Sequence, residues 1–286
     1  MAHQFTRVEF SNLDKILYPE LRITKKQVIE YYIRTAPRML QILGDRPAVL
    51  TRFPNGIHEE GFYEKDAPIG KPTWVETFRN FSETAKRNID YVLCNNLDTL
   101  VWLANLAALE IHIALSKAKQ YKTPDLILFD LDPQPPGVMD DVVNVALLLK
   151  EKLGERGYES FVKTSGKKGL HVVVPIREEY TFQKTRNFVH EIGKELADDS
   201  EKIISEAHAK KPGAILIDYV QNSHGKTMIC PYSLRAVPKA TVSMPLEWNQ
   251  VKKGLNPEDF SIANVTRVEK EPWTDLLTKK QKLEEK

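Results

Sequence analysis

The chain has 286 residues, enough for one large domain or two small ones. Its hydrophobic content of 42% and charged content of 28% are those of an ordinary globular protein, and its net charge of +2 is too small to indicate a partner. Cys94 and Cys230 form no CxxC metal pattern, which favours a reducing cytoplasm. The longest apolar stretch, 97–115, contains acidic and amide residues, which argues against a membrane span.

The first predicted helix begins with a capping-box pattern, Thr24 followed by Gln27, and runs to about residue 43. Pro37 lies inside it and predicts a kink or a break. Lys25 and Lys26 place ammonium groups beside the free N–H groups of the first turn, which suits a phosphate. The alternative is a pair of solvated lysines.

A hairpin-like unit follows, with strands over 48–53 and 61–65. It carries Arg52, Phe62 and Tyr63. Adjacent aromatic residues in a strand face opposite sides, so one is expected in the core and the other free to stack on a base or sugar. The alternative is that both pack into the protein.

Residues 66–90 are polar and are expected to form exposed loops with at most one short strand, before a strand over 89–93. The stretch 97–119 has no glycine or proline and is predicted to be one helix. His112 lies on it among apolar residues, either as a hydrogen-bonded core residue or as a ligand-binding one.

The stretch 126–133 is an apolar strand interrupted by two carboxylates, Asp130 and Asp132. Residues i and i+2 of a strand face the same side, so these two point together. Their repulsion and burial cost are usually relieved by a divalent cation, and hard oxygen ligands suit Mg²⁺ or Mn²⁺. The alternative is one turn-capping aspartate and one exposed aspartate.

After a helix over 139–153, two strands over 159–164 and 170–175 flank a glycine-rich basic turn, and His171 begins the second strand. Glycines let backbone N–H groups approach an anion, and the lysines supply charge. The spacing is not that of a Walker A loop, because a strand follows instead of a helix. A plain hairpin with a basic turn remains the alternative.

A helix is predicted over 181–197 and irregular chain over 198–213. The apolar strand 214–220 then contains a lone carboxylate, Asp218, which is costly unless it is paired or bound to metal. Arg235 follows in a segment expected to return toward the same region.

Three carboxylates, a basic glycine-rich turn, a strand histidine and a later arginine together suggest metal-dependent chemistry on phosphates. In a two-metal mechanism one cation activates the attacking oxygen and the other stabilises the leaving pyrophosphate. No covalent nucleophile motif is present.

Several motifs in this order resemble the polymerase domain of bacterial ligase D, an archaeo-eukaryotic primase superfamily member that works in non-homologous end joining. They are NLDKILYP (12–19), RFPNG (52–56), FYEK (62–65), ALEIH (108–112), FDLDP (129–133), TSGKKGLH (164–171), DYVQNS (218–223) and PYSLR (231–235). The resemblance covers nearly the whole chain.

The resemblance implies a role for each candidate residue. The metal-binding catalytic residues would be Asp130, Asp132 and Asp218, holding two Mn²⁺ or Mg²⁺ ions. The nucleotide-binding residues would be Arg52, Phe62, His112, Ser165, Lys168, His171 and Arg235. The DNA-binding residues would be Lys15 and Lys25, at the 5′-phosphate of a gap or break, and Tyr63. The segment 79–90 matches a family loop thought to bring broken ends together.

The resemblance also implies an α+β fold with an RRM-like mixed or antiparallel catalytic sheet. One catalytic domain would span 1–286, with an N-terminal α/β lobe over 1–120, the catalytic lobe over 121–240 and a peripheral wrap and tail over 241–286. The charged end, 279–286, is expected to be frayed because of its composition. The protein would extend a primer at gaps or double-strand breaks, with NTP or dNTP and a preference for ribonucleotides. Its partners would be a separate ligase and Ku, in the cytoplasm with the nucleoid and without a membrane.

Other functions compatible with these residues are de novo primer synthesis, metal-dependent phosphodiester cleavage and, more weakly, glycosyl transfer at an Asp-x-Asp site. A non-catalytic DNA-end binding module is the alternative from a different class.

Overall fold

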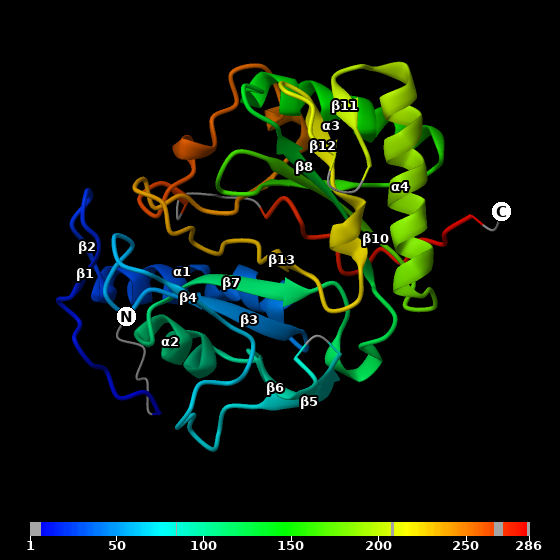
Figure 1. Ribbon diagram of the computed structural model, residues 1–286. Helices are drawn as coiled ribbons and strands as arrows, with labels where there is room; N and C mark the ends of the chain where they lie inside the picture. Colours follow the sequence, from blue (N-terminus) through cyan, green and yellow to red (C-terminus); the bar gives the residue numbers. More distant parts are fainter. Residues whose placement is uncertain (1–6, 84, 207–208, 266–270, 285–286) are drawn as a thin grey trace.

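Two six-stranded sheets, each covered by two helices on its outer side, make up the body of the protein (Figure 1). A computed structural model describes residues 7–83, 85–206, 209–265 and 271–284. The helices are α1 (Lys25–Leu43), α2 (Leu97–Asn105), α3 (Met139–Glu155) and α4 (Phe182–Asp199). A separate two-stranded sheet near the N-terminus consists of β1 (Ile16–Tyr18) and β2 (Ile23–Thr24).

The first large sheet, which we call the N-terminal sheet, packs its outer face against α1 and α2 (Figure 1). Its strands are β3 (Pro47–Arg52), β4 (Phe62–Glu64), β5 (Thr77–Ser82), β6 (Arg87–Leu93), β7 (Ala108–Ala114) and β13 (Thr227–Ile229). Their order is β13-β7-β3-β6-β5, with β4 also paired to β3, and all pairs are antiparallel. Along β7, Ile111 and Ile113 join the main core, so Glu110 and His112 face the opposite side.

The second large sheet, the catalytic sheet, has the RRM-like arrangement that the resemblance implied. Its strands are β8 (Leu126–Pro133), β9 (Phe161–Thr164), β10 (Leu170–Pro175), β11 (Ile203–Ile204), β12 (Ile215–Ile217) and β14 (Pro245–Leu246). The unit β8-α3-β9-β10-α4-β12 has the spatial order β12-β8-β10-β9, which is fourth, first, third, second. The fold is α+β, as predicted.

Four short 3₁₀ helices complete the described secondary structure. They are η1 (Ala118–Gln120), η2 (Tyr219–Asn222), η3 (Trp248–Gln250) and η4 (Pro257–Asp259). None of the helices in the described part of the chain combines the length and apolar character required to cross a membrane.

The prediction of one helix over 97–119 is wrong. The helix ends at Asn105, Ala107 adopts a left-handed φ of 57°, and β7 begins at Ala108. Apolar residues alternate with Glu110 and His112 from there on, which is the period of a strand. The absence of glycine and proline concealed this turn, because an alanine makes it.

Three other expectations about local structure also fail. Residues 66–90 contain all of β5 and the start of β6, which pair in register from Thr77 to Ser82, and residue 84 between them lies outside the described residues. The stretch 198–213 contains β11, which pairs with β12. Helix α1 is not broken at Pro37, because one lost hydrogen bond is outweighed by its buried face, and a kink there stays a prediction.

The chain crosses between the two sheets late in the sequence. β13 adds to the N-terminal sheet by pairing with β7, although it lies within the 121–240 segment, and β14 then returns to the catalytic sheet beside β9. The segment 279–284 is anchored instead of frayed, since Gln281 Nε2 donates to Glu159 O at 2.9 Å and Leu283 is buried.

Candidate active site

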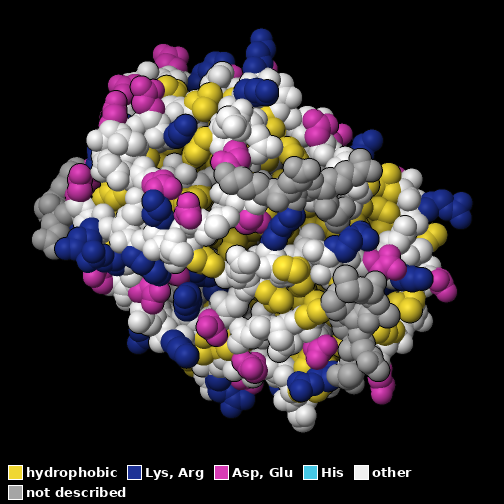
Figure 2. All heavy atoms as spheres, turned by 180° about the vertical axis from the view of Figure 1, so that it is seen from behind, with side chains coloured by type: hydrophobic (Ala, Val, Ile, Leu, Met, Phe, Trp, Pro, Cys, Tyr) yellow, Lys and Arg dark blue, Asp and Glu magenta, His cyan; other side chains and the backbone are white. Residues whose placement is uncertain are grey.

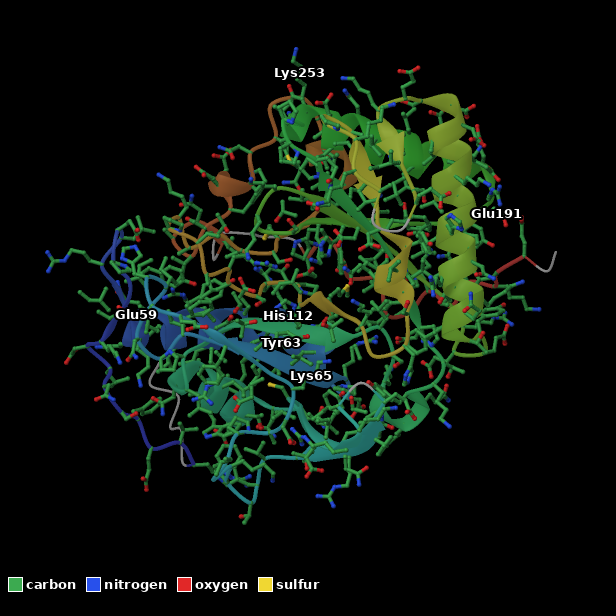
Figure 3. All side chains as sticks on the ribbon, in the orientation of Figure 1. Glu59, Tyr63, Lys65, His112, Glu191 and Lys253 are labelled. Carbon is green, nitrogen blue, oxygen red and sulfur yellow. The ribbon has the colours of Figure 1, made fainter. Side chains whose placement is uncertain are left out.

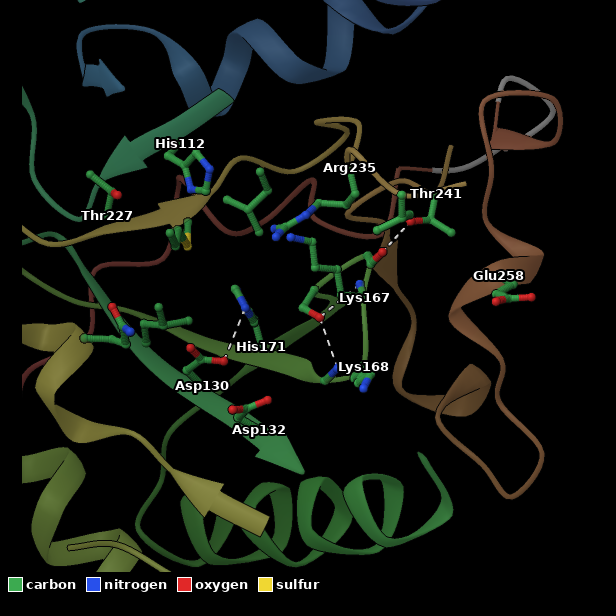
Figure 4. Close-up of a pocket in the computed structure, with 18 of the residues that line it drawn as sticks. His112, Asp130, Asp132, Lys167, Lys168, His171, Thr227, Arg235, Thr241 and Glu258 are labelled. Carbon is green, nitrogen blue, oxygen red and sulfur yellow. Dashed lines mark hydrogen bonds and ion pairs between the residues drawn. The ribbon is translucent and has the colours of Figure 1, made fainter. Parts of the chain in front are cut away.

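The paired carboxylates project from one face of the catalytic sheet (Figure 4). Phe129 and Leu131 are buried in the core between them, so Asp130 and Asp132 share the other face of β8, as predicted. Strand register places His171 on β10 opposite Asp130, and Lys163 on β9 opposite His171. These three form a polar row across β9, β10 and β8.

Among the described residues, neither carboxylate forms an ion pair with a lysine or an arginine, and the charges of Lys163 and Arg235 only partly offset the repulsion at Asp130. Burial, followed by the charges of Asp132 and Asp218, raises the pKa of Asp130 to about 7. Burial and Asp218 also raise the pKa of Asp132, and only Lys168 opposes this. An acidic pair held together at such a cost is typical of a functional site.

His171 contacts this pair as a neutral imidazole. Its Nε2 lies 3.4 Å from Asp130 Oδ1. Burial, followed by the charges of Lys163 and Arg235, holds the pKa of His171 well below its usual value. The imidazole therefore does not cancel the charge of Asp130.

The third predicted carboxylate, Asp218, is joined to the first through its backbone, and its side chain bonds the start of η2. Its N–H donates to Asp130 O at 3.0 Å, at the end of β12. Its carboxylate caps η2, accepting from Val220 N at 2.9 Å and Gln221 Nε2 at 3.2 Å. Within the described ranges no three His, Cys, Asp or Glu side chains are grouped closely enough to hold a metal ion.

The chemistry of the donors nevertheless fits a hard divalent cation. Two unneutralised carboxylates converge, and a third carboxylate is attached to the neighbouring strand end. A site built from all three requires the carboxylate of Asp218 to move closer to the other two.

The glycine-rich turn between β9 and β10 is held tightly against both the catalytic strand and Arg235. Ser165 Oγ accepts from Lys167 N at 3.2 Å and from Gly169 N at 3.1 Å. Gly166 has φ 73°, and a Cβ there would lie 2.6 Å from Arg235 Cγ. A Cβ at Gly169 would lie 2.3 Å from the backbone oxygen of β8, so both positions require glycine.

A pocket of about 710 Å³ lies between the two sheets and contains most of the predicted site. Its described lining includes seven of the predicted residues: His112, Asp130, Asp132, Ser165, Lys168, His171 and Arg235. Figure 4 shows the carboxylates on the catalytic-sheet side and His112 and Arg235 across from them. Its volume is within the range of small-molecule sites.

A second pocket of about 490 Å³ adjoins the first, with His112, Gln221 and Thr227 in both linings. Tyr63 lines this second pocket, and its ring meets that of His112 edge to face at 6.1 Å. Figure 3 shows Tyr63, Lys65 and His112 together beside β7. Tyr63 therefore faces the second pocket.

Arg52 and Phe62 are not brought to either pocket. The guanidinium of Arg52 lies 5.0 Å from the Phe62 ring centroid, and it bonds Glu64 Oε2 at 2.9 Å and the Leu106 carbonyl at 3.1 Å. The prediction that one of the two aromatics is a core residue is wrong, because Phe62 is 43% exposed and Tyr63 53%.

Lys15 and Lys25 lie together, outside both pockets. Lys15 Nζ bonds Asn55 Oδ1 at 2.6 Å, and the nearly buried Lys25 Nζ bonds the Asn105 carbonyl at 3.0 Å. Burial and the charge of Lys15 lower the pKa of Lys25. The expectation of free N–H groups here is wrong, because Lys25 N and Lys26 N donate to backbone oxygens of the preceding loop.

Sequence reasoning missed several residues of this site. Four residues lie in or against the pocket without having been assigned a role: Glu110, Lys163, Gln221 and Lys239. Glu110 had a detectable signal, since it is a lone carboxylate in the apolar run 108–114. On the rear face of the molecule, by contrast, basic and acidic side chains are interspersed (Figure 2).

The family model for the LigD primase-polymerase domain matches residues 24–276. The chain belongs to this family. Members of the LigD primase-polymerase family are nucleotidyltransferases, so this protein is an enzyme of that class. Five of the motifs that indicated the family contribute residues to the first pocket, namely ALEIH, FDLDP, TSGKKGLH, DYVQNS and PYSLR.

Two LigD proteins and one solved structure illustrate the similarity. The chain is 32% identical over 280 residues to the bifunctional non-homologous end joining protein LigD of Bacillus subtilis, covering 94% of this chain and 44% of that protein. It is 31% identical over 257 residues to the multifunctional LigD of Mycolicibacterium smegmatis, covering 87% of this chain and 33% of that one. The chain thus spans less than half the length of these relatives.

The structural match is to the polymerase domain of Mycobacterium tuberculosis ligase D, solved in complex with DNA. The TM-score is 0.84 at 28% sequence identity, covering 91% of this chain and 93% of that domain. The LigD polymerase fold therefore accounts for nearly all of the chain.

Proposed function

We propose that this LigD-family polymerase extends the 3′ end of a primer at gaps or breaks in DNA during non-homologous end joining. The observation that carries the proposal is the pocket between the sheets, in which two unneutralised carboxylates lie beside a basic, glycine-rich turn. Metal-dependent nucleotidyl transfer needs these two components, one for cations and one for a triphosphate.

Asp130, Asp132 and Asp218 would hold two divalent cations, Mn²⁺ or Mg²⁺. When bound, the cations would activate the primer hydroxyl and stabilise the leaving pyrophosphate. The raised pKa values of Asp130 and Asp132 support this role, because a cation would relieve the repulsion that causes them. Asp218 would contribute once its carboxylate has moved within coordination distance of the other two.

The protein's own residues would hold the nucleotide. The turn at Ser165 would present backbone N–H groups, while Lys168 and Arg235 would supply positive charge to the triphosphate. His171, kept neutral by burial, would donate or accept a hydrogen bond without adding charge. His112 would contact the sugar or base from the opposite wall.

The DNA would lie along the two adjoining pockets and extend beyond them. Tyr63 would stack on a template base, since it is exposed beside His112. Arg52 and Phe62, which lie outside the pockets, would contact the strand beside the gap, although the resemblance assigned them to the nucleotide. Lys15 and Lys25 would bind the 5′-phosphate of the downstream strand.

The remaining parts of the proposal depend on the family alone. The protein would prefer ribonucleotides, cooperate with a DNA ligase and Ku, and act at the nucleoid in the cytoplasm. The names of its relatives support a role in end joining.

The test is incubation with a gapped, 5′-phosphorylated duplex, Mn²⁺ and labelled NTPs or dNTPs. We expect extension by one or a few nucleotides, with faster use of NTPs. Extension that needs no primer would favour a primase instead. Tight DNA binding without any extension, in either metal, would favour a non-catalytic end-binding module and contradict the proposal.

A further inference from the structure

One buried carboxylate outside the predicted metal site contacts the basic groups of the pocket. Glu110 lies on β7 of the N-terminal sheet, and its side chain is only 7% exposed. It is on the face of the sheet that carries His112, toward the catalytic sheet. A lone buried carboxylate is costly unless partners compensate for its lost hydration.

Glu110 has such partners on both oxygens. Its Oε1 lies 3.1 Å from Arg235 Nε and 3.5 Å from Lys167 Nζ, and it accepts a hydrogen bond from Ala236 N at 3.1 Å. Its Oε2 lies 3.4 Å from His112 Nε2.

These partners come from three different parts of the chain. Lys167 belongs to the turn between β9 and β10 of the catalytic sheet, and Arg235 to the segment that follows β13. Glu110 itself belongs to the opposite sheet. One carboxylate therefore links the two walls of the pocket at the point where the triphosphate is proposed to bind.

The charge of Glu110 persists in spite of its burial. Burial alone would raise the pKa of Glu110, but its contacts with His112, Arg235 and Lys167 outweigh this and bring it to about 2. The carboxylate therefore stays ionised at any pH at which the enzyme would work.

Arg235 keeps part of its bonding capacity unused. Among the described residues, Arg235 Nε and His112 Nε2 are buried nitrogens without a hydrogen bond, although both lie within 3.4 Å of Glu110. The ion pair thus restrains the guanidinium without saturating it.

We propose that Glu110 is the positioning residue that orients Arg235 and Lys167 to receive the triphosphate of the incoming nucleotide. This inference rests on the proposed polymerase function and assigns Glu110 no contact with the reacting atoms. A carboxylate near the phosphates would repel them if it acted only through its charge. Its benefit must therefore come from the order that it imposes on two flexible cations.

The two effects have opposite signs, which makes the inference testable. Glu110→Gln keeps the shape of the side chain and removes its charge. If orientation dominates, KM for the nucleotide rises about tenfold with a smaller change in kcat, and the Kd of a non-hydrolysable NTP analogue rises by the same factor. If repulsion dominates, both constants fall, and the inference is overturned. Unchanged constants overturn it as well.

Glu195→Gln is the matched control. Glu195 also pairs with one arginine and one lysine, Arg156 and Lys152, but between α3 and α4. The Glu195→Gln substitution removes the same charge and similar contacts at a place away from the pocket. KM and Kd should therefore stay at the wild-type values.

A second variant covers the possibility that Glu110→Gln does not fold. Glu110→Asp keeps the charge and withdraws it by one methylene, so the Kd of the analogue should rise several-fold, and an unchanged Kd would contradict positioning. The binding assay also separates the two proposals. Wild-type protein that binds the analogue but extends no primer refutes the proposed function alone, whereas wild-type protein that binds no triphosphate refutes both.

Discussion

The carboxylates at the two ends of strand β8 lie in opposite environments. Asp125, just before the strand, is 3% exposed and receives both Nη atoms of the fully buried Arg46, each at 2.6 Å. Asp130 and Asp132, at the other end, face each other and a pocket, and their pKa values are raised.

The difference separates a structural charge from a functional one. The Arg46–Asp125 pair satisfies itself within the fold, so nothing remains for a ligand to do. The Asp130–Asp132 pair stays unneutralised at a cost to stability, and that cost is recovered only when something positive binds. The predictions below test this contrast, from the largest expected effect to the smallest.

Replacing Asp130 should affect activity and stability in opposite directions. We expect Asp130→Asn to reduce primer extension more than about 10³-fold, because a metal ligand is lost. Relief of the repulsion should raise the Tm of the metal-free protein by about 2–4 °C, equivalent to roughly 1 kcal/mol. Extension and thermal unfolding measure the two effects, with DNA binding as the control. A lowered Tm would contradict the view that the Asp130–Asp132 repulsion destabilises the metal-free protein.

Replacing Asp125 should do the reverse. Asp125→Ala leaves the buried charge of Arg46 without its partner and should destabilise the protein by about 3–5 kcal/mol. Denaturant unfolding measures this loss. Below the unfolding transition, extension should remain near the wild-type rate, because the pair does not line the pocket. A large loss of activity in folded protein would show that this end of β8 is functional too.

Gly166→Ala should disturb the basic turn. The new Cβ would meet Arg235 Cγ at 2.6 Å while the backbone holds a φ of 73°. We expect a loss of about 1–3 kcal/mol in stability and about tenfold weaker nucleotide binding. Gly70→Ala is the control, since Gly70 has φ 77° but no atom near the new Cβ. If both variants had equal effects, backbone strain alone would explain them, and the contact with Arg235 would have no role.

The contribution of Glu110 to stability should depend on pH. Its pKa of about 2 in the folded protein lies below the ordinary value of 4.5, so its ionised form stabilises the fold above about pH 4.5. That contribution is lost as the pH falls toward 2. The difference in Tm between the wild type and Glu110→Gln should therefore amount to several degrees at pH 5 and shrink below it. A difference that is constant with pH would argue against the ion pairs.

The smallest effect is expected at the proposed 5′-phosphate site. Lys25→Ala should lower the preference for a phosphorylated over an unphosphorylated gap and flatten the salt dependence of binding by about one unit of log–log slope. Lys26→Ala, an exposed neighbour, should change neither. An unchanged preference in Lys25→Ala would remove Lys25 from the proposal.

Local patterns in the sequence predicted a large part of the site. The i and i+2 spacing placed Asp130 and Asp132 on one face, the capping box began α1 at the observed residue, and the glycine-rich turn lies where its residues indicated. Each of these features depends on backbone geometry within a few residues. The family resemblance added the RRM-like fold, which such patterns alone do not specify.

The sequence by itself thus determined which residue types occur together along each strand and turn. The tertiary structure decided which of them meet. It turned the carboxylate of Asp218 toward η2, moved Arg52 and Phe62 away from the pocket, and placed Glu110 between Arg235 and Lys167. These outcomes depend on burial and charge across segments more than a hundred residues apart, as for Glu110 and Arg235, and no local periodicity records them.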